Sequence, residues 1–413
     1  MISLGTGAPN PRCFPFESVV ITTKDGKTIT LKGQELNTAL SYTDSLGLPS
    51  LIEWLHGFQK RLHDPPYARE DQSLNQIIVT PGSQDGLCKV LEMLLEPGDS
   101  VLVPEPAYPG ALSAMRPMRV NFLPIQMDED GVDPESLRQV LKEQEKNALN
   151  SLKGRVMPRV LIIQPNHCNP TGVSTTLQRR KEIYELACQY DLLIIEDDPY
   201  YFLTFDHEGT GHRLPPPSFL SFDTEGRVLR LESYSKVVSA GLRVGTLSGP
   251  RPLIQRVMMH IDCSSLHAST FTQTMLYRLL VEYGQDGFLE HGRKVAEFYE
   301  NQCQMMLNAA KRHLTGLATW NRPSGGMFLW IQLLDVSDTQ RMITEKASKK
   351  MVMLTPGNVF MCDDMKPTSN LRASFSWASE EQMNEGFRRL AQMACEEEKT
   401  RKVILKRSAS CIA

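Results

Sequence analysis

The sequence is poor in the features that would assign it to several large classes of protein. No apolar run among its 413 residues approaches the length of a membrane-spanning helix. The net charge of -3 gives no reason to expect nucleic acid or an anionic membrane as a partner. Its nine cysteines are scattered singly, without a Cys-x-x-Cys pair, which indicates neither a zinc site nor a disulfide framework. This cysteine usage is typical of a reducing compartment.

The two ends of the sequence carry no targeting signal that can be identified. The stretch Met1-Ile-Ser-Leu-Gly-Thr-Gly is strand-like, with neither a basic amphipathic leader nor a secretory apolar segment. Taken literally, this start predicts a cytoplasmic protein. The charge run from Glu396 to Ala413 has little apolar periodicity and predicts a frayed helix or a mobile tail.

Most of the chain alternates between short apolar runs and amphipathic stretches. After a hairpin around Asp25-Gly26 and a helix over 50–62, the runs that predict strands lie at 76–80, 100–104, 120–124, 160–164, 192–195 and 228–231. Helices between such strands predict an α/β fold with a mostly parallel sheet covered on both faces. In such sheets ligands bind at the carboxyl ends of the strands.

The last third of the chain follows a different pattern. A long helical section over 252–314, with its expected break at Gly284 or Gly287, is followed by strands at 328–333, 351–354 and 371–375 and a closing helix over 380–394. This pattern predicts a smaller α+β domain. We therefore expect an N-terminal segment (1–39) packed with the small domain, a large domain (40–285), the small domain (286–395) and a charged tail (396–413).

A lysine after an apolar strand is the first candidate for chemistry. Leu231-Glu-Ser-Tyr-Ser-Lys236 follows the strand at 228–231, and Arg243 comes a few residues later. A lysine walled by apolar residues can act as an amine nucleophile, and nearby hydroxyls with an arginine suit a phosphate. These are the groups that pyridoxal phosphate needs as Schiff-base partner and anchor. An ordinary surface lysine after a strand would give the same local pattern.

Polar residues follow three of the other strands. Ser83-Gln84 begins a helix, where backbone N–H groups can bind an anion and where a serine also serves as a simple cap. Tyr108 is placed to stack on a planar cofactor or to fill the core. Asn169, in an Asn-Pro turn, can hydrogen-bond a ring oxygen. Asp198 leaves a buried strand and needs a cation, either a protonated pyridine nitrogen or a metal, although no companion ligands for a metal stand nearby.

The order of these motifs resembles the fold-type-I pyridoxal-phosphate aminotransferases. The resemblance covers nearly the whole chain and rests on Ser83-Gln84, Tyr108, Asn169-Pro-Thr-Gly, Asp198-x-x-Tyr201, Ser233-x-Ser-Lys236, Arg243 and Arg372. Within that family the sequence is most similar to the kynurenine/α-aminoadipate aminotransferases, in stretches such as Ile194-Ile-Glu-Asp-Asp-Pro-Tyr-Tyr-Phe-Leu and Gly325-Gly-Met-Phe-Leu-Trp-Ile.

The resemblance implies a role for each of these residues. Three are implied to be catalytic, namely Lys236 as Schiff-base and proton-transfer lysine, Asp198 at the pyridine nitrogen and Tyr201 at the phenolic oxygen. Cofactor binding is implied for Ser83, Gln84, Tyr108, Asn169, Asp198, Tyr201, Ser233, Ser235, Lys236 and Arg243. Substrate binding is implied for Gly7, Tyr42, Tyr108, Asn169 and Arg372, with Arg372 at the α-carboxylate and Tyr42 reaching the neighbouring subunit of a homodimer. No residue is assigned to a metal.

The implied activity is transamination of amino acids such as 2-aminoadipate and kynurenine, with 2-oxoglutarate as acceptor. Small-molecule substrates, a homodimer and a mitochondrial location follow from the same resemblance, with no nucleic acid or membrane partner. A pyridoxal-phosphate-sensing module without activity, or another fold-type-I reaction such as decarboxylation or β-elimination, would share the cofactor motifs.

The sequence departs from the family pattern in two places. Members usually carry, before the Met1-Ile-Ser-Leu stretch, a helical segment with an arginine that closes over the substrate. The family pattern also has small or amide residues where His167-Cys168 precedes Asn169. The resemblance therefore implies a complete cofactor site and an altered substrate side.

Overall fold

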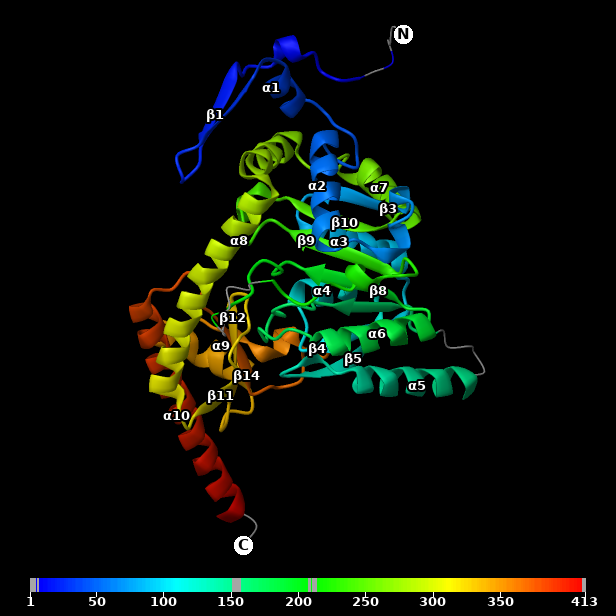
Figure 1. Cartoon of the computed structure of the whole chain (residues 1–413). Coiled ribbons are helices and arrows are strands. Elements are labelled where there is room, and N and C mark those ends of the chain that lie inside the picture. Colours follow the sequence, from blue (N-terminus) through cyan, green and yellow to red (C-terminus); the bar gives the residue numbers. More distant parts are fainter. Residues whose placement is uncertain (1–4, 6, 151–156, 207–208, 210–213, 411–413) are drawn as a thin grey trace. The chain divides into compact units, whose positions relative to one another are not determined.

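The computed structural model describes residues 5, 7–150, 157–206, 209 and 214–410. The chain divides into two compact units (elements labelled in Figure 1). The first unit comprises Met1–Glu96, Ala187–Pro199 and Pro217–His291, and the second Pro97–Leu186, Tyr200–Pro216 and Gly292–Ala413. The domain boundaries expected from the sequence stay a prediction. No helix among the described residues is long and apolar enough to cross a membrane.

Four strands of the first unit lie in the order β3 (Asn75–Thr80), β10 (Gly245–Pro250), β9 (Val228–Ser233) and β8 (Leu193–Asp198). The pair β8 and β9 is parallel, whereas β10 runs antiparallel to both of its neighbours. This register places Asp198 opposite Glu232 and Gly245 opposite both Ser233 and Thr80. Helices α2 (Pro49–Leu62), α3 (Ser83–Leu94) and α7 (Arg251–Ser264) belong to the same unit.

The second unit holds two groups of strands. In the first group the order is β7 (Val160–Ile163), β4 (Ser100–Glu105), β5 (Asn121–Asp128) and β6 (Gly131–Val132), with β4 parallel to β5 and to β7. Helices α4 (Pro109–Met115), α5 (Pro134–Asn150) and most of α6 (Leu177–Gln189) accompany these strands. The parallel pairings are those that the alternating pattern predicts.

The other sheet of the second unit is antiparallel, in the order β11 (Ala318–Trp320), β12 (Phe328–Leu333), β14 (Asn370–Ser374) and β13 (Thr355–Pro356). Helices α9 (Thr339–Lys350) and α10 (Glu380–Ser410) belong with it. Buried residues such as Leu329, Ile331, Leu371 and Phe387 form its core. This is the α+β pattern predicted for the end of the chain.

The predicted N-terminal hairpin is present in the first unit as β1 (Ser18–Thr22) and β2 (Thr28–Lys32), followed by α1 (Gly33–Ala39). Ile29, Leu31, Leu36 and Ala39 form a small buried cluster there. The strand-like stretch at 1–4 lies outside the described residues.

Three expectations about single elements were wrong. The residues 351–354 form no strand: Met351 is left-handed at φ 51°, and the short strand begins at Thr355. The long helical section is broken after Ser264, where Leu266 has φ 62°, and α8 (Thr270–Leu314) is kinked at Gly284. The kink was expected, but the earlier break was not.

The closing helix does not end at residue 394. Helix α10, red in Figure 1, continues to Ser410 through the charge run. Its acidic residues meet basic residues of α9, with Lys350 Nζ 2.6 Å from a Glu396 oxygen and Lys346 Nζ 2.7 Å from a Glu397 oxygen. These ion pairs join residues far apart in the sequence. Of the two alternatives expected for the charge run, a helix and a mobile tail, the helix is the one present up to Ser410.

Candidate functional site

The N-terminus of α3 presents the first group of candidate residues. Gly82, at φ 85°, precedes the helix, and Ser83 and Gln84 open it, both half-buried. The neighbouring strand approaches closely, because a Cβ on Gly245 would lie 2.8 Å from the Gly82 carbonyl carbon and in contact with the Ser83 nitrogen. Gly82 thus lets the Arg243 guanidinium come close to the start of the helix, and Gly245 lets β10 pack against it, beside the first N–H groups of a helix, where an anion is favoured.

The turn after β9 reaches the same place. Arg243, in the left-handed region at φ 53°, extends Nη1 to 3.4 Å from Ser235 Oγ and Nη2 to 3.5 Å from the Pro81 carbonyl. The Ser235 N–H donates to Ser233 Oγ at 3.3 Å. Lys236 lies half-buried on this turn. The structure therefore brings the predicted phosphate-binding residues of the first unit together as one cradle.

Asp198 ends β8 beside a buried arginine. Its Oδ2 lies 2.9 Å from Nη2 of Arg230, and both side chains are fully buried. Nη1 of the same guanidinium lies 3.0 Å from Glu196 Oε1. The third carboxylate, Glu232, accepts hydrogen bonds from Nη2 at 3.0 Å and from Nε at 3.2 Å. One guanidinium is therefore shared among three carboxylates.

The cluster extends from Glu232 to the end of α2. His63 Nε2 lies 3.2 Å from the Glu232 carboxylate, and its Nδ1 lies 2.9 Å from the Ser218 hydroxyl. Burial on its own raises the pKa of Glu232, but the charges of Arg230 and His63 outweigh it and lower that pKa to about 2. Glu232 is therefore ionised at neutral pH, and since a carboxylate only accepts, His63 Nε2 carries a proton.

Arg372 is the centre of the second unit's candidate residues. It lies on β14 opposite Trp330 and Thr355 of the neighbouring strands. Its Nη1 donates to Asn169 Oδ1 at 2.8 Å and its Nη2 to Thr355 Oγ1 at 3.3 Å. The guanidinium carbon lies 4.1 Å from the Phe328 ring centroid and 5.1 Å from that of Phe360.

The environment of Arg372 favours an added anion. Its buried Nε has no hydrogen-bond partner. Burial lowers the pKa of Arg372, whereas Tyr200 and Tyr108 raise it by a smaller amount. A guanidinium that lies against two aromatic rings and keeps an N–H without an acceptor is suited to bind a carboxylate. The structure thus brings Asn169, Arg372 and Tyr108 together.

The remaining predicted residues of this unit lie in turns. Tyr108 precedes α4 and is half-buried, and Tyr201 is buried with its ring 5.0 Å from that of Phe202. Asn169 is buried in a turn with a cis peptide bond to Pro170, and its N–H donates to Gln164 Oε1 at 3.1 Å.

His167, a departure from the family pattern, joins three segments of the second unit. It is buried and left-handed at φ 48°. Nδ1 lies 3.0 Å from Ser174 Oγ and 3.2 Å from Ser324 Oγ, and Nε2 lies 2.9 Å from Thr204 Oγ1. The ring thereby links the Asn169 turn with the segment after Tyr201.

Two predicted residues have no contact with the cradle of the first unit. Gly7 is exposed, with no atom within 4 Å of the position a Cβ would take. Tyr42 is 62% exposed and meets His267 edge to face, with 5.8 Å between the ring centroids.

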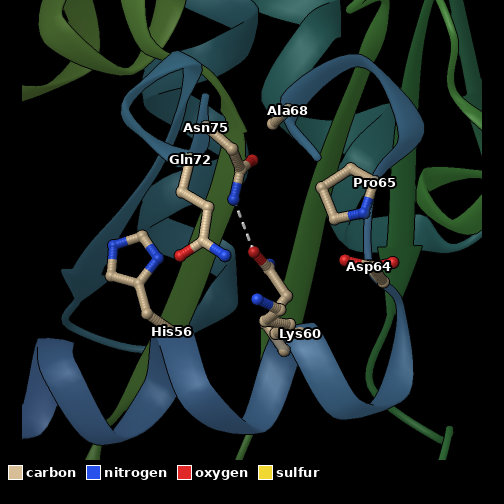
Figure 2. A pocket seen from close by; sticks show the side chains of 8 residues that line it. His56, Lys60, Asp64, Pro65, Ala68, Gln72 and Asn75 are labelled. Carbon is tan, nitrogen blue, oxygen red and sulfur yellow. Dashed lines mark hydrogen bonds between the residues drawn. The ribbon is translucent and has the colours of Figure 1, made fainter. Parts of the chain in front are cut away.

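The cavity in Figure 2 belongs to a different place in the first unit. Its volume of about 30 Å³ is enough for a single water molecule, so it is no substrate pocket. None of the predicted site residues lines it; its lining consists of His56, Gln59, Lys60, Asp64, Pro65, Ala68, Gln72 and Asn75. Within the described part of the chain no group of three metal-binding side chains occurs, and the eight described cysteines form no disulfide.

The buried charge cluster was not predicted from the sequence. Arg230 stands inside the apolar run Val228-Leu-Arg-Leu231, and an arginine within a buried strand is a signal that carboxylates lie nearby. The sequence does not identify these carboxylates. Glu196 and His63 come from other elements, and only the β8–β9 register sets Asp198 opposite Glu232.

Known proteins are similar to this chain over most of its length. The family model described as aminotransferase class I and II matches residues 1–390. The mitochondrial kynurenine/alpha-aminoadipate aminotransferase of Rattus norvegicus is 47% identical over 395 residues, covering 95% of this chain and 91% of the relative. The enzyme of the same name from Bos taurus is 46% identical over 396 residues, with the same coverage.

Solved structures agree with the fold. The Pyrococcus horikoshii kynurenine aminotransferase, solved with PMP, KYN and KYA, has a TM-score of 0.79 at 30% identity, covering 88% of this chain and 84% of that one. The Thermus thermophilus alpha-aminoadipate aminotransferase, complexed with N-(5'-phosphopyridoxyl)-L-leucine, has a TM-score of 0.74 at 29% identity, covering 88% and 85%. The predicted fold class is confirmed by these matches.

Proposed function

Since this chain belongs to the class I and II aminotransferase family, we propose that it transfers the amino group of 2-aminoadipate, kynurenine and related amino acids to 2-oxoglutarate, with pyridoxal phosphate as cofactor. The observation that carries the proposal is Arg372. Its side chain is half-buried and the buried Nε has no hydrogen-bond partner, and amino and oxo acids both bring a carboxylate that can accept from it. The named activity of the 47% identical relative supports the choice of substrates.

The residues of the first unit fit the cofactor. The first N–H groups of α3, beginning at Ser83, suit a phosphate, with Gln84, Ser233, Ser235 and Arg243 as further donors. Asp198 supplies a carboxylate for a protonated pyridine nitrogen. When bound, pyridoxal phosphate supplies a sink for the electron pair left on the substrate Cα after its proton departs.

The protein's own groups then carry out binding and proton transfer. Lys236 would hold the cofactor through its amine and would serve as the base for the proton of the substrate Cα. Asp198 would accept the hydrogen bond of the ring nitrogen and so favour its protonated form.

Residues of the second unit would orient ring and substrate. Tyr201 and Asn169 would donate to the phenolic oxygen, and Tyr108 would stack on the ring. Arg372 would bind the substrate carboxylate, and Gly7, a residue of the first unit, is proposed beside the substrate by resemblance alone. Asn169 is itself held by Arg372 at 2.8 Å, so that a substrate carboxylate and the cofactor oxygen are positioned by connected groups.

A product assay tests the proposal. The protein reconstituted with pyridoxal phosphate is incubated with 2-aminoadipate or kynurenine and 2-oxoglutarate, and glutamate, oxo-acid product and CO2 are measured. We expect glutamate and the oxo acid in equal amounts. Release of CO2 or of an elimination product would replace the proposal by another pyridoxal-phosphate reaction, and cofactor binding without turnover of any donor would indicate a sensing module. Lys236→Ala serves as the inactive control.

Two further features are proposed by resemblance. The Rattus norvegicus relative is named mitochondrial, and we propose the same compartment, testable by fractionation of cells that express the native gene product. We also propose a homodimer in which Tyr42 reaches the partner's site, because its ring is 62% exposed.

A further inference from the structure

The buried cluster around Arg230 offers an inference that rests on the proposed function. Removing an arginine from water is expensive unless carboxylates pair with it, yet one carboxylate would suffice for the charge. Here Glu196, Asp198 and Glu232 all approach the same guanidinium, at 3.0, 2.9 and 3.0 Å. The excess of carboxylates around one guanidinium requires an explanation.

The hydrogen bonds are divided unequally among the three carboxylates. Glu232 accepts hydrogen bonds from both Nε and Nη2, whereas Glu196 forms an ion pair with Nη1. Asp198 shares Nη2 with Glu232. Asp198 therefore receives only part of the charge of Arg230, whereas an aspartate in an exclusive bidentate pair would be largely neutralised.

The two glutamates are themselves held in place. Glu196 accepts the backbone N–H of Phe219 at 2.9 Å and that of Leu220 at 3.3 Å. Glu232 is held by His63, which is fixed in turn by Ser218. Neither glutamate is free to leave the guanidinium, so the sharing is built into the fold of the first unit.

We propose that Glu196, Glu232 and Arg230 are positioning residues that orient Asp198 while leaving it anionic enough to keep the cofactor's pyridine nitrogen protonated. Arg230 fixes the direction of the Asp198 carboxylate. Glu232 accepts from Nε and Nη2, and Glu196 forms an ion pair with Nη1, so both limit how far Arg230 neutralises Asp198. His63 secures Glu232 in this arrangement.

The test measures protonation of the ring directly. Wild type, Glu232→Gln and Glu196→Gln are reconstituted with pyridoxal phosphate labelled with ¹⁵N in the ring, and the nitrogen chemical shift is followed against pH. Each substitution removes one competitor for Arg230, and we expect the ratio of protonated to unprotonated nitrogen to fall about tenfold, which corresponds to about one pKa unit of the ring nitrogen. The kcat should fall with it, while KM for the amino acid stays unchanged.

A matched control lies close by. Glu225→Gln removes a carboxylate that pairs with Arg227 at the surface of the same unit, and should leave the ¹⁵N shift and kcat unchanged. Urea unfolding of each variant shows whether a change in the ring reflects unfolding.

The outcomes separate the two levels of the proposal. A fall in ring protonation in both glutamine variants supports the positioning role. Unaltered ring protonation and kcat in folded variants that hold the cofactor would overturn it and leave the cluster a structural ion network. If the wild-type protein itself binds no pyridoxal phosphate, it is the proposed function that fails.

Discussion

At the scale of single residues, surroundings decide what a charged side chain can do. Arg372 and Arg388 are both arginines of the second unit. Arg388 is exposed and forms a fork with Glu385, with donor–acceptor distances of 2.7 and 2.8 Å. Arg372 lies between two aromatic rings with a buried Nε that lacks a partner. Only Arg372 therefore has both the position and the spare donor to bind a carboxylate.

Arg372→Lys tests this assignment. Lysine keeps the charge but lacks the planar fork, so one charge-assisted hydrogen bond worth about 1.5–3 kcal/mol is lost. We expect kcat/KM for 2-aminoadipate to fall by about one to two orders of magnitude, at ~1.4 kcal/mol per tenfold. Pyridoxal-phosphate affinity should be unchanged, and Arg388→Lys should behave as wild type. Equal losses in both variants would remove Arg372 from the substrate site.

Asp198 and Asp197 provide a second comparison of neighbours. Both are buried, but successive side chains of a strand point to opposite faces, so only one of them can meet the ring nitrogen. Asp198→Asn should reduce kcat by about two to three orders of magnitude, because it removes a charge preorganised for the reaction. Asp197→Asn should cost far less. Steady-state kinetics of the two variants decides, and equally inactive enzymes would contradict the assignment.

At the scale of elements, the approach of β10 to α3 shapes the phosphate cradle. A Cβ at Gly245 would lie 2.8 Å from the Gly82 carbonyl carbon and 2.9 Å from the Glu232 carbonyl oxygen. Both are backbone atoms, so no side-chain rotation can relieve the contact. Gly245→Ala should therefore displace the start of α3.

The expected loss follows from the cost of overpacking. Forcing a methyl group into a packed site costs roughly 1–3 kcal/mol. If this cost falls on the cradle, the Kd for pyridoxal phosphate rises about ten- to a hundredfold, measurable by absorbance titration of the apoprotein. Gly287→Ala, where the nearest atom would be Tyr283 Cβ at 3.4 Å, is the control and should bind the cofactor normally.

The contact between α9 and α10 gives a prediction about stability. Glu397 is buried and forms ion pairs with both Lys346 and Arg341. Glu397→Gln removes the buried carboxylate that both cations share and leaves them only longer contacts, Arg341 with Glu345 at 3.7 Å and Lys346 with Glu396 at 3.9 Å, so it should lower the free energy of unfolding by roughly 1–3 kcal/mol. Glu345→Gln breaks only an exposed contact of 3.7 Å and should cost less than about 0.5 kcal/mol. Urea midpoints at constant m-value compare the two, and similar midpoints would show that α10 is held by its apolar face alone.

At the scale of the whole molecule, the proposed dimer makes a prediction of its own. Tyr42 is proposed to act in the partner's site, so a Tyr42→Ala subunit and a Lys236→Ala subunit should each be inactive or weak when alone. Unfolded together and refolded, about half of the dimers are mixed, and each mixed dimer carries one intact site. We expect roughly one quarter of wild-type activity in the mixture. No recovery above the separate variants, with mixed dimers verified by mass, would place Tyr42 in its own subunit's site or outside the site.

The sequence by itself determined the alternation of strands and helices and the position of each motif just after a strand. This was possible because apolar periodicity and turn residues are local properties of the chain. It thereby placed Ser83, Asp198, Lys236 and Arg243 in one predicted site. In the structure Ser83 and Arg243 lie at the cradle, Lys236 lies on the turn after β9, and Asp198 ends β8.

Only the tertiary structure decided features that depend on residues far apart in the chain. The antiparallel direction of β10, the continuation of α10 along α9 and the three carboxylates gathered around Arg230 have no local signature. A buried arginine indicates that carboxylates lie nearby, because an unpaired charge in the core is energetically costly. Which carboxylates these are, and how they share the guanidinium, is fixed by strand register and packing.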